Sequence, residues 1–232
     1  MENGAAPTAP AVIVAIDGPS GTGKSSTSKA VAAQLGLSYL DTGAQYRAIT
    51  WWMVTNGIDT DDPHAVAAAA GKPEIVSGTD PAAPTITVDG TDVAKPDPHP
   101  GGHLQGQRGQ RRPRGAGPDH RAAAHHRRCG APQGIVVEGR DIGTTVLPDA
   151  DLKIFLTASA EARAARRSGE LKGADVNVTR EALIKRDAAD SSRKTSPLAK
   201  ADDAVEVDTT ELTLPQVIEC VVTLVEEKRA GK

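Results

Sequence analysis

The sequence predicts an α/β fold with a parallel β-sheet. Short apolar runs rich in β-branched residues alternate with segments of helical spacing. The first of these runs leads through a glycine-rich turn directly into a helical segment, and no internal repeat breaks the order. With 232 residues, the chain is long enough to bury a sizeable core as one domain with small inserts.

The N-terminal elements set the pattern. Residues 11–16 form a continuous apolar run (Ala-Val-Ile-Val-Ala-Ile), which is typical of a strand buried on both faces of a parallel sheet. Residues 24–35 change to helical spacing, and Gly36 is placed to end that helix. A short second strand and a second helix are then expected at residues 38–40 and 44–54.

The C-terminal half repeats the alternation. Strands are expected at residues 135–137, 152–156 and 204–207, and helices at residues 160–167, 180–189 and 214–228. Apolar residues recur with helical spacing in the last of these helices, which predicts an amphipathic closing helix. A polar loop is expected at residues 169–177.

Residues 72–95 depart from this rhythm. Two short alternating stretches, 74–77 and 85–88, are separated by Gly and Pro residues, which predicts a small antiparallel insert. The predicted organisation is a core of residues 11–71 and 134–232, the insert at residues 72–95, and an anomalous basic segment at residues 95–133.

A phosphate-binding motif stands between the first strand and the first helix. Its sequence, Gly-Pro-Ser-Gly-Thr-Gly-Lys-Ser, fits G-x-x-x-x-G-K-[ST] in the context that this pattern requires. Glycines let successive backbone N–H groups point at phosphate oxygens, and the helix N-terminus adds the positive end of its dipole. The residues expected to bind a nucleoside triphosphate are Gly18, Pro19, Ser20, Gly21, Thr22, Gly23, Lys24, Ser25 and Ser26.

Two residues of this motif have specific expected roles. Lys24 should reach the β and γ phosphates, and the Ser25 hydroxyl should ligate Mg²⁺. Lys24 is expected to face solvent when no nucleotide is bound. The alternative is a glycine turn that happens to contain Lys-Ser. The motif alone does not separate kinases from GTPases, ATPases or transporters, so other residues must identify the acceptor.

Three further motifs follow in order, at residues 39–47 (Tyr-Leu-Asp-Thr-Gly-Ala-Gln-Tyr-Arg), 137–144 (Val-Glu-Gly-Arg-Asp-Ile-Gly-Thr) and 185–193 (Lys-Arg-Asp-Ala-Ala-Asp-Ser-Ser-Arg). Together with the phosphate-binding motif and the strand at residues 153–156, they resemble the bacterial cytidylate (CMP) kinases. The resemblance covers most of residues 11–94 and 134–228. One departure is Gln45, where the family usually has an apolar residue.

The resemblance implies a three-layer P-loop kinase core, an inserted monophosphate-binding domain and an Arg-bearing helical lid at about residues 163–178. Such an enzyme transfers phosphate from ATP to CMP or dCMP, with Mg²⁺. Arginine suits the acceptor phosphate because its guanidinium group combines charge with bidentate geometry. The lid residues implied are Arg163, Arg166 and Arg167.

The resemblance also implies residue roles at the acceptor site. Asp41 and Thr42 would hold the ribose and base end of the acceptor. Its phosphate would be held by Arg47, Arg140 and Arg186. The cytosine would be contacted by Asp141 and Arg193, and the sugar by Asp190. The expected catalytic residues are Lys24, Arg140, Asp141 and Arg186.

Each of these sites has an alternative interpretation. The triplet Asp41-Thr42-Gly43 also occurs in aspartic proteases, but a second triplet and a mostly β chain are missing. For Arg140 and Asp141, the alternative to an acceptor site is an ordinary surface ion pair. Likewise, the three lid arginines are the solvated face of a helix if they do not meet phosphate. A P-loop kinase for another small acceptor is the alternative function.

Composition excludes several other classes. Residues 11–16 are far too short to span a membrane, and residues 1–10 lack the basic start and long apolar stretch of a signal peptide. Cys129 and Cys220 alone cannot build a disulfide framework or a zinc site. We therefore expect a monomeric cytoplasmic protein with no membrane partner and no nucleic-acid partner.

Residues 95–133 require a separate explanation. They hold one Lys and seven Arg against two Asp, a net charge of +6, which leaves −9 for the rest of the chain. Leu104 is their only Leu, Ile, Val, Met or aromatic residue, so they cannot supply an apolar helix face. One interpretation is a natural basic insert, as an arm that binds nucleic acid on a degenerate kinase core. It lacks the aromatic residues on which bases stack.

The favoured interpretation is a compensated frameshift, because GC-rich codons read out of phase yield Arg, Pro, Gly, His and Ala. Residues 107–117 can be encoded so that a start one base later reads Ser-Ala-Val-Ser-Ala-Val-Pro-Glu-Val-Arg. This resembles a family stretch whose first serine and last arginine contact cytosine. The chain as written has Gln107 and Ala116 at those positions.

Overall fold

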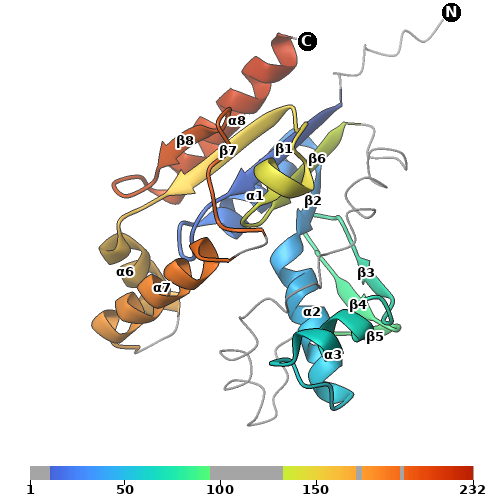
Figure 1. Ribbon diagram of the computed structural model, residues 1–232. Coiled ribbons are helices and arrows are strands. Elements are labelled where there is room, and N and C mark those ends of the chain that lie inside the picture. Colours follow the sequence, from blue (N-terminus) through green and yellow to red (C-terminus); the bar gives the residue numbers. More distant parts are fainter. Residues whose placement is uncertain (1–10, 95–132, 171–173, 194–195, 232) are drawn as a thin grey trace, which may run out of the picture.

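The computed structural model describes residues 11–94, 133–170, 174–193 and 196–231. They form a five-stranded parallel sheet in the order β2-β6-β1-β7-β8 and a separate antiparallel sheet in the order β3-β4-β5 (Figure 1). The parallel strands are β1 (Val12–Asp17), β2 (Ser38–Asp41), β6 (Gly134–Glu138), β7 (Leu152–Thr157) and β8 (Val205–Asp208). The antiparallel strands are β3 (Ile75–Ser77), β4 (Ile86–Val88) and β5 (Thr91–Asp92). The expected α/β class and small antiparallel insert are confirmed.

Helices precede or follow most of these strands. They are α1 (Lys24–Leu35), α2 (Thr42–Thr55), α3 (Pro63–Ala69), α6 (Ala160–Glu170), α7 (Val176–Ser191), α8 (Leu214–Ala230) and a short π-helical turn, η1 (Ile142–Val146). Helices α1 and α8 pack together on one face of the parallel sheet (Figure 1). Helices α6 and α7 pack against each other beyond the ends of β7 and β8.

β1 is buried on both faces, as its continuous apolar sequence predicts. Val14 and Ile16 face the core shared with α1 and α8, and both are 0% exposed. Ala15 faces the opposite core, where Ile142 of η1 and Leu147 pack beside β6. Each fully buried Val or Ile side chain contributes about 1.5–3 kcal/mol to stability. The centre of the sheet therefore provides a rigid base for the loop that follows β1.

The insert is attached to α2. Trp52 of α2 packs against the insert core, and its indole N–H donates to Asp89 at 2.8 Å. Asp89 also accepts the backbone N–H of Glu74 at 2.8 Å, which ties the turn between β4 and β5 to the start of β3. The backbone N–H of Tyr39 donates to the Thr79 carbonyl, so the insert also contacts β2. The antiparallel sheet is held to the core from two sides.

Several expected boundaries need correction. The polar loop expected at residues 169–177 is wrong at both ends, because α6 continues to Glu170 and α7 begins at Val176. The side chain of Asp175 accepts the backbone N–H groups of Asn177 and Val178 and so starts α7 early. Helix α3 and strand β5 were not expected.

The anomalous segment is not covered by this description. Residues 95–132 lie outside the described residues, so the frameshift and the basic-arm interpretations stay predictions. Within the described ranges, no helix is long and apolar enough to cross a membrane.

The strands point their carboxyl ends toward one edge of the sheet, where α2, α6 and α7 also lie (Figure 1). Three neighbouring strands end in acidic residues at this edge: Asp41 in β2, Glu138 in β6 and Asp17 in β1. Ligands of open α/β sheets bind outside this edge. The candidate site is therefore sought here.

Candidate active site

The loop between β1 and α1 has the backbone of a phosphate-binding loop. Gly18 has a φ of +144°, and a Cβ there would lie 2.1 Å from the carbonyl oxygen of Leu156. No other residue type fits this close approach between β1 and β7. Gly23 caps α1 in the left-handed region, with a φ of +88°. The loop thus leads directly to the helix N-terminus, where backbone N–H groups are free to bind an anion.

Lys24 is the first residue of α1, and it is folded back onto the loop. Its Nζ donates to the carbonyl of Pro19 at 2.6 Å, and the residue is only 7% exposed. The expectation that Lys24 faces solvent without a ligand is therefore wrong, because the loop carbonyl takes the place of a phosphate oxygen. Burial, and next the charge of Arg140, hold the pKa of Lys24 well below its ordinary value.

Arg140 and Arg186 lie close to this lysine, and Arg47 lies close to Arg186. Arg140 follows β6, Arg186 lies on α7 and Arg47 lies on α2. Burial, and next the charge of Arg140, lower the pKa of Arg186 to about 10, with a smaller effect from Arg47. The Nε of Arg186 is buried and has no hydrogen-bond partner among the described residues. Such a concentration of positive charge suits an anionic ligand.

Asp190 of α7 orients two of the expected acceptor residues. Its carboxylate accepts a hydrogen bond from Nε of Arg140 at 2.9 Å and forms an ion pair with Arg193. The Asp190 side chain is 4% exposed, so these two guanidinium groups satisfy a buried carboxylate. The pairing also holds α7 against the turn after β6.

Asp41, Thr42 and Arg47 lie where β2 passes into α2. Asp41 caps α2 by accepting the N–H of Ala44 at 3.0 Å and also pairs with Nη2 of Arg47 at 3.0 Å. Thr42 is buried, and its hydroxyl donates to the carbonyl of Glu138 at 2.8 Å. In this structure Thr42 therefore links α2 to β6.

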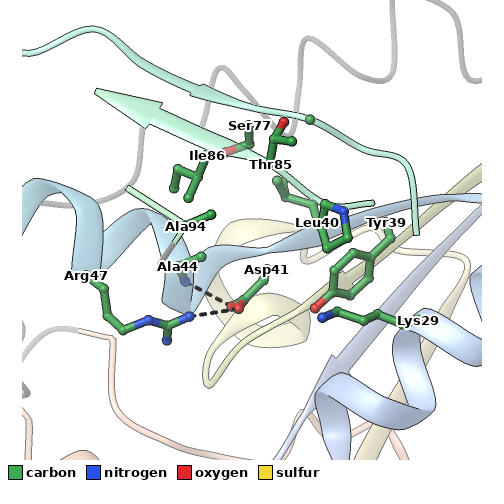
Figure 2. A pocket seen from close by; sticks show the side chains of 12 residues that line it. Lys29, Tyr39, Leu40, Asp41, Ala44, Arg47, Ser77, Thr85, Ile86 and Ala94 are labelled. Atoms are coloured by element: carbon green, nitrogen blue, oxygen red, sulfur yellow. Dashed lines mark hydrogen bonds and ion pairs between the residues drawn. The ribbon is translucent and has the colours of Figure 1, made fainter. Parts of the chain in front are cut away.

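A cavity of about 170 Å³ opens beside Asp41, between the core and the insert. Figure 2 shows Asp41 at its centre, with Arg47 on one side and Lys29 beneath the Tyr39 ring on the other. Its lining residues are Lys29, Tyr39, Leu40, Asp41, Ala44, Arg47, Ser77, Gly78, Pro84, Thr85, Ile86 and Ala94. Only Asp41 and Arg47 of the expected acceptor residues line it.

Glu138 was not singled out from the sequence as a site residue. It is 2% exposed, accepts a hydrogen bond from the Tyr39 hydroxyl and also bonds to the Ser25 hydroxyl. Burial, and next the charge of Asp41, raise the pKa of Glu138. Its position at the carboxyl end of a buried strand was the signal that could have identified it.

The Ser25 hydroxyl and the Glu138 carboxylate fit a Mg²⁺ site. Both supply hard oxygen donors, and Mg²⁺ in kinases needs only one or two protein ligands in addition to phosphates and water. Ser25 is exposed, so its hydroxyl is accessible from the loop side. Within the described residues, no group of three or more His, Cys, Asp or Glu side chains is placed to hold a metal. A metal here would therefore depend on the bound nucleotide.

Asp17 and Asp141 are two further buried carboxylates. The two oxygens of Asp17 accept the backbone N–H groups of Ile142 and Gly143 at 2.9 and 2.8 Å. Burial raises the pKa of Asp17 to about 6, although these two hydrogen bonds oppose the shift. Asp141, expected near the cytosine, is 2% exposed, and its backbone carbonyl accepts the N–H of Thr145. Asp17 was also missed from the sequence.

The expected lid arginines have protein partners in this structure. Arg163 forms an ion pair with Asp187 of α7 and donates to the Ser20 carbonyl at 3.1 Å. Asp187 in turn accepts the N–H of Ser20 at 3.3 Å, so α6, α7 and the phosphate-binding loop meet at one residue.

The other two lid arginines bond to residues outside the loop. Arg166 donates to the Thr209 hydroxyl at 3.0 Å and to the carbonyls of Thr209 and Leu212. Arg167 pairs with Glu170 and is half exposed, so it alone matches the alternative of a solvated helix face.

Comparison with known proteins gives a consistent result. The family model described as "Cytidylate kinase" matches residues 14–96 and 118–227. A cytidylate kinase of Streptomyces coelicolor is 82% identical over 236 aligned residues, which cover 100% of both chains. One from Rhodococcus jostii is 46% identical and covers 94% of this chain and 96% of the relative. The solved structure of TT1252 from Thermus thermophilus shares the fold, with a TM-score of 0.52, 13% identity and coverage of 94% and 98%.

Proposed function

Because the chain belongs to the cytidylate kinase family, we propose that it transfers the γ-phosphoryl group of ATP to CMP and dCMP, with Mg²⁺. Membership of the family implies phosphorylation of a nucleotide. The observation that carries the finer proposal is the convergence of Lys24, Arg140 and Arg186 beside the phosphate-binding loop. Two anionic substrates must be brought together, and this cluster supplies the neutralising charge.

The donor nucleotide is proposed to bind the loop of residues 18–26. Its phosphates would accept the backbone N–H groups at the start of α1 and replace the Pro19 carbonyl as the partner of Lys24. Lys24 then neutralises charge on the transferring phosphoryl group. Because burial disfavours its ammonium form without ligand, binding an anion favours the charged form. The catalytic contribution of Lys24 is electrostatic rather than covalent.

The acceptor nucleotide is proposed to bind between α2, the turn after β6 and α7. Arg47, Arg140 and Arg186 would hold its phosphate. Asp190 keeps Arg140 in place through the 2.9 Å bond and is proposed to contact the sugar. The remaining acceptor contacts proposed are Asp41 and Thr42 at the ribose and base end, and Asp141 and Arg193 at the cytosine.

Ser25 and Glu138 are proposed to hold Mg²⁺ together with nucleotide oxygens. Mg²⁺ supplies charge that stabilises the developing phosphoryl-transfer transition state. Glu138 holds the Ser25 hydroxyl through a hydrogen bond, and Tyr39 orients Glu138. The protein's remaining task is to place the two substrates in line and to exclude water.

An acceptor panel tests this proposal. ADP release from Mg-ATP is measured with CMP, dCMP, UMP, AMP and shikimate as acceptors. We expect CMP and dCMP to give the highest kcat/KM. Preference for any acceptor without cytosine overturns the assignment, and an identical low rate with all five acceptors rejects acceptor phosphorylation by this chain. A monomeric state and a cytoplasmic location are part of the same proposal.

A further inference from the structure

We propose that Asp17 is a positioning residue for the acceptor side of the active site, because its buried carboxylate fixes the turn that carries Arg140 and Asp141. This inference rests on the proposed function, which places acceptor contacts on that turn. Asp17 is the last residue of β1 and directly precedes Gly18 of the phosphate-binding loop. Asp17 is therefore adjacent in sequence to the donor site, and its side chain is hydrogen-bonded to the turn of the acceptor site.

Each oxygen of the Asp17 carboxylate accepts a different backbone N–H group of the turn. Oδ1 of Asp17 accepts the N–H of Ile142 at 2.9 Å, and Oδ2 accepts the N–H of Gly143 at 2.8 Å. These N–H groups begin η1 and have no partner within that turn, because the first amides of any helical segment lack one. The side chain of Asp141, which precedes them, makes no capping hydrogen bond. Asp17 thus takes the capping role that the preceding residue normally fills.

Neighbouring contacts restrict the turn to this position. The N–H of Gly139 donates to the carbonyl of Ile16 at 3.0 Å, so both ends of the turn are bonded to the end of β1. A Cβ at Gly143 would lie 3.1 Å from Cδ of Lys153, so the turn also packs closely against a side chain of β7. A shift of the Asp17 carboxylate would therefore be transmitted to Arg140 and Asp141.

Asp17 does not act on a substrate directly. It is 5% exposed, and both its oxygens are already used by the backbone. The charges that face it are Lys24 of α1, which favours its ionised form, and Asp141, which opposes it. An ionised carboxylate offers two acceptors to two N–H donors, which no neutral side chain of the same size does.

The test compares Asp17→Asn with a matched control. The amide keeps one acceptor but points an NH₂ group at a backbone N–H, so one of the two bonds is lost. The control is Asp151→Asn, because the Asp151 carboxylate also accepts a backbone N–H group, that of Ile13 at 2.7 Å, near the opposite end of β1. Both variants are compared with the unaltered full chain by steady-state kinetics, calorimetric binding of ATP and of CMP, and amide hydrogen exchange.

For Asp17→Asn we expect the KM and Kd for CMP to rise about 10-fold, as for loss of one buried hydrogen bond. The Kd for ATP should change less than about 2-fold, since no N–H group of the loop is altered. Exchange at the Ile142 and Gly143 amides should be faster, whereas Asp151→Asn should leave CMP affinity unchanged. If the role of Asp17 is only structural, both variants lose thermal stability, and the affinities for CMP and for ATP change to the same extent.

Three results overturn the inference: unchanged CMP affinity in Asp17→Asn, an equal loss for ATP and CMP, or the same loss in Asp151→Asn. Failure of the proposed function is seen separately, because the unaltered chain then shows no CMP binding by calorimetry and no CMP-dependent ADP release in the acceptor panel. Calorimetry measures CMP binding even when turnover is slow, so a low rate does not obscure the comparison.

Discussion

Lys24 is buried in this structure although its proposed role is to meet a phosphate. Replacing it by Met removes an ammonium group that stabilises charge in the transition state, so we expect kcat to fall at least about 100-fold. The fold should persist, because Met fills a similar volume beside Pro19. The matched control is Lys200→Met, which removes only an exposed ion pair with Glu206. Near-normal turnover in Lys24→Met would contradict the proposed role of the phosphate-binding loop.

The pH dependence of stability provides a second test of Lys24. Its pKa lies well below the ordinary value of 10.5, so the unfolded chain binds this proton more tightly than the folded one. The unfolding free energy contributed by Lys24 therefore rises with pH between the folded pKa and the ordinary value. We expect Lys24→Met to have the higher melting temperature at about pH 7, and the difference to shrink at about pH 9.5. Differential scanning fluorimetry without nucleotide measures this, and a pH-independent difference contradicts it.

Arg140 tests the acceptor side. Arg140→Lys keeps the charge but loses the planar group that bonds Asp190 and can grip a phosphate. We expect the KM for CMP to rise about 10- to 100-fold, as for loss of a charged hydrogen bond, with little change in ATP affinity. Arg180→Lys, which alters an exposed pair with Glu161, is the control. Equal effects of the two substitutions would assign Arg140 to a structural ion pair.

Residue types could be predicted from the sequence more fully than residue environments. The glycines and the lysine of the phosphate-binding loop stand out by spacing alone. That Lys24 turns back to the Pro19 carbonyl depends on a loop geometry that spacing does not specify. Glu138 and Asp17 were missed because each gains its partners from segments far away in the sequence.

At the scale of elements, the start of α7 gives a direct prediction. Asp175→Ala removes the side chain that accepts the N–H groups of Asn177 and Val178. The unfolding free energy should fall by about 1 kcal/mol. The melting temperature should therefore fall by about 2–4 °C. Asp175→Ser, which retains a capping oxygen, should recover most of the loss. The KM for CMP should not change, because Arg186 lies near the other end of the helix, and a large change would contradict this separation.

Elements with one dominant signal were predicted well. The boundaries of α1 agree with the sequence because glycines stand at both ends, at Gly23 and Gly36. Helix α3 was missed although Asp62 and Pro63 form a cap and a first turn, because its seven residues carry too short an apolar pattern. Strand β5 has two residues and depends on its pairing with β4, so no local pattern indicates it.

At the scale of the whole molecule, we predict that the chain as written is a poor enzyme. Restoring the reading frame through residues 95–133 should recover its activity. The chain has Gln107 and Ala116 where the frame-shifted reading has a serine and an arginine. The family model also leaves residues 97–117 unmatched. Losing hydrogen bonds to a base costs about 1–3 kcal/mol for each partner left unpaired. ATP affinity should be retained, because the phosphate-binding loop lies elsewhere, while CMP turnover rises in the restored chain.

Sequencing of the coding DNA is the direct measurement. Two compensating changes near codons 95 and 133 are expected relative to the gene of a functional relative. If the DNA is intact and the chain as written phosphorylates CMP at ordinary kinase rates with cytosine selectivity, the frameshift interpretation is wrong. Residues 95–133 must then supply base recognition by another route.

The strand order has a consequence for how this molecule is made. β1 and β2 are synthesised first, but β6 lies between them, paired in register with both. A nascent chain that has not yet produced β6 therefore holds two strands that cannot close a sheet, and its phosphate-binding loop has no fixed base. Closing the connection becomes only slowly harder as it lengthens, by about 0.6 kcal/mol for each doubling. The length of the connection between β2 and β6 thus adds little to the cost of closing the sheet, and a ribosome-stalled chain should acquire ATP binding only after β6 has left the exit tunnel.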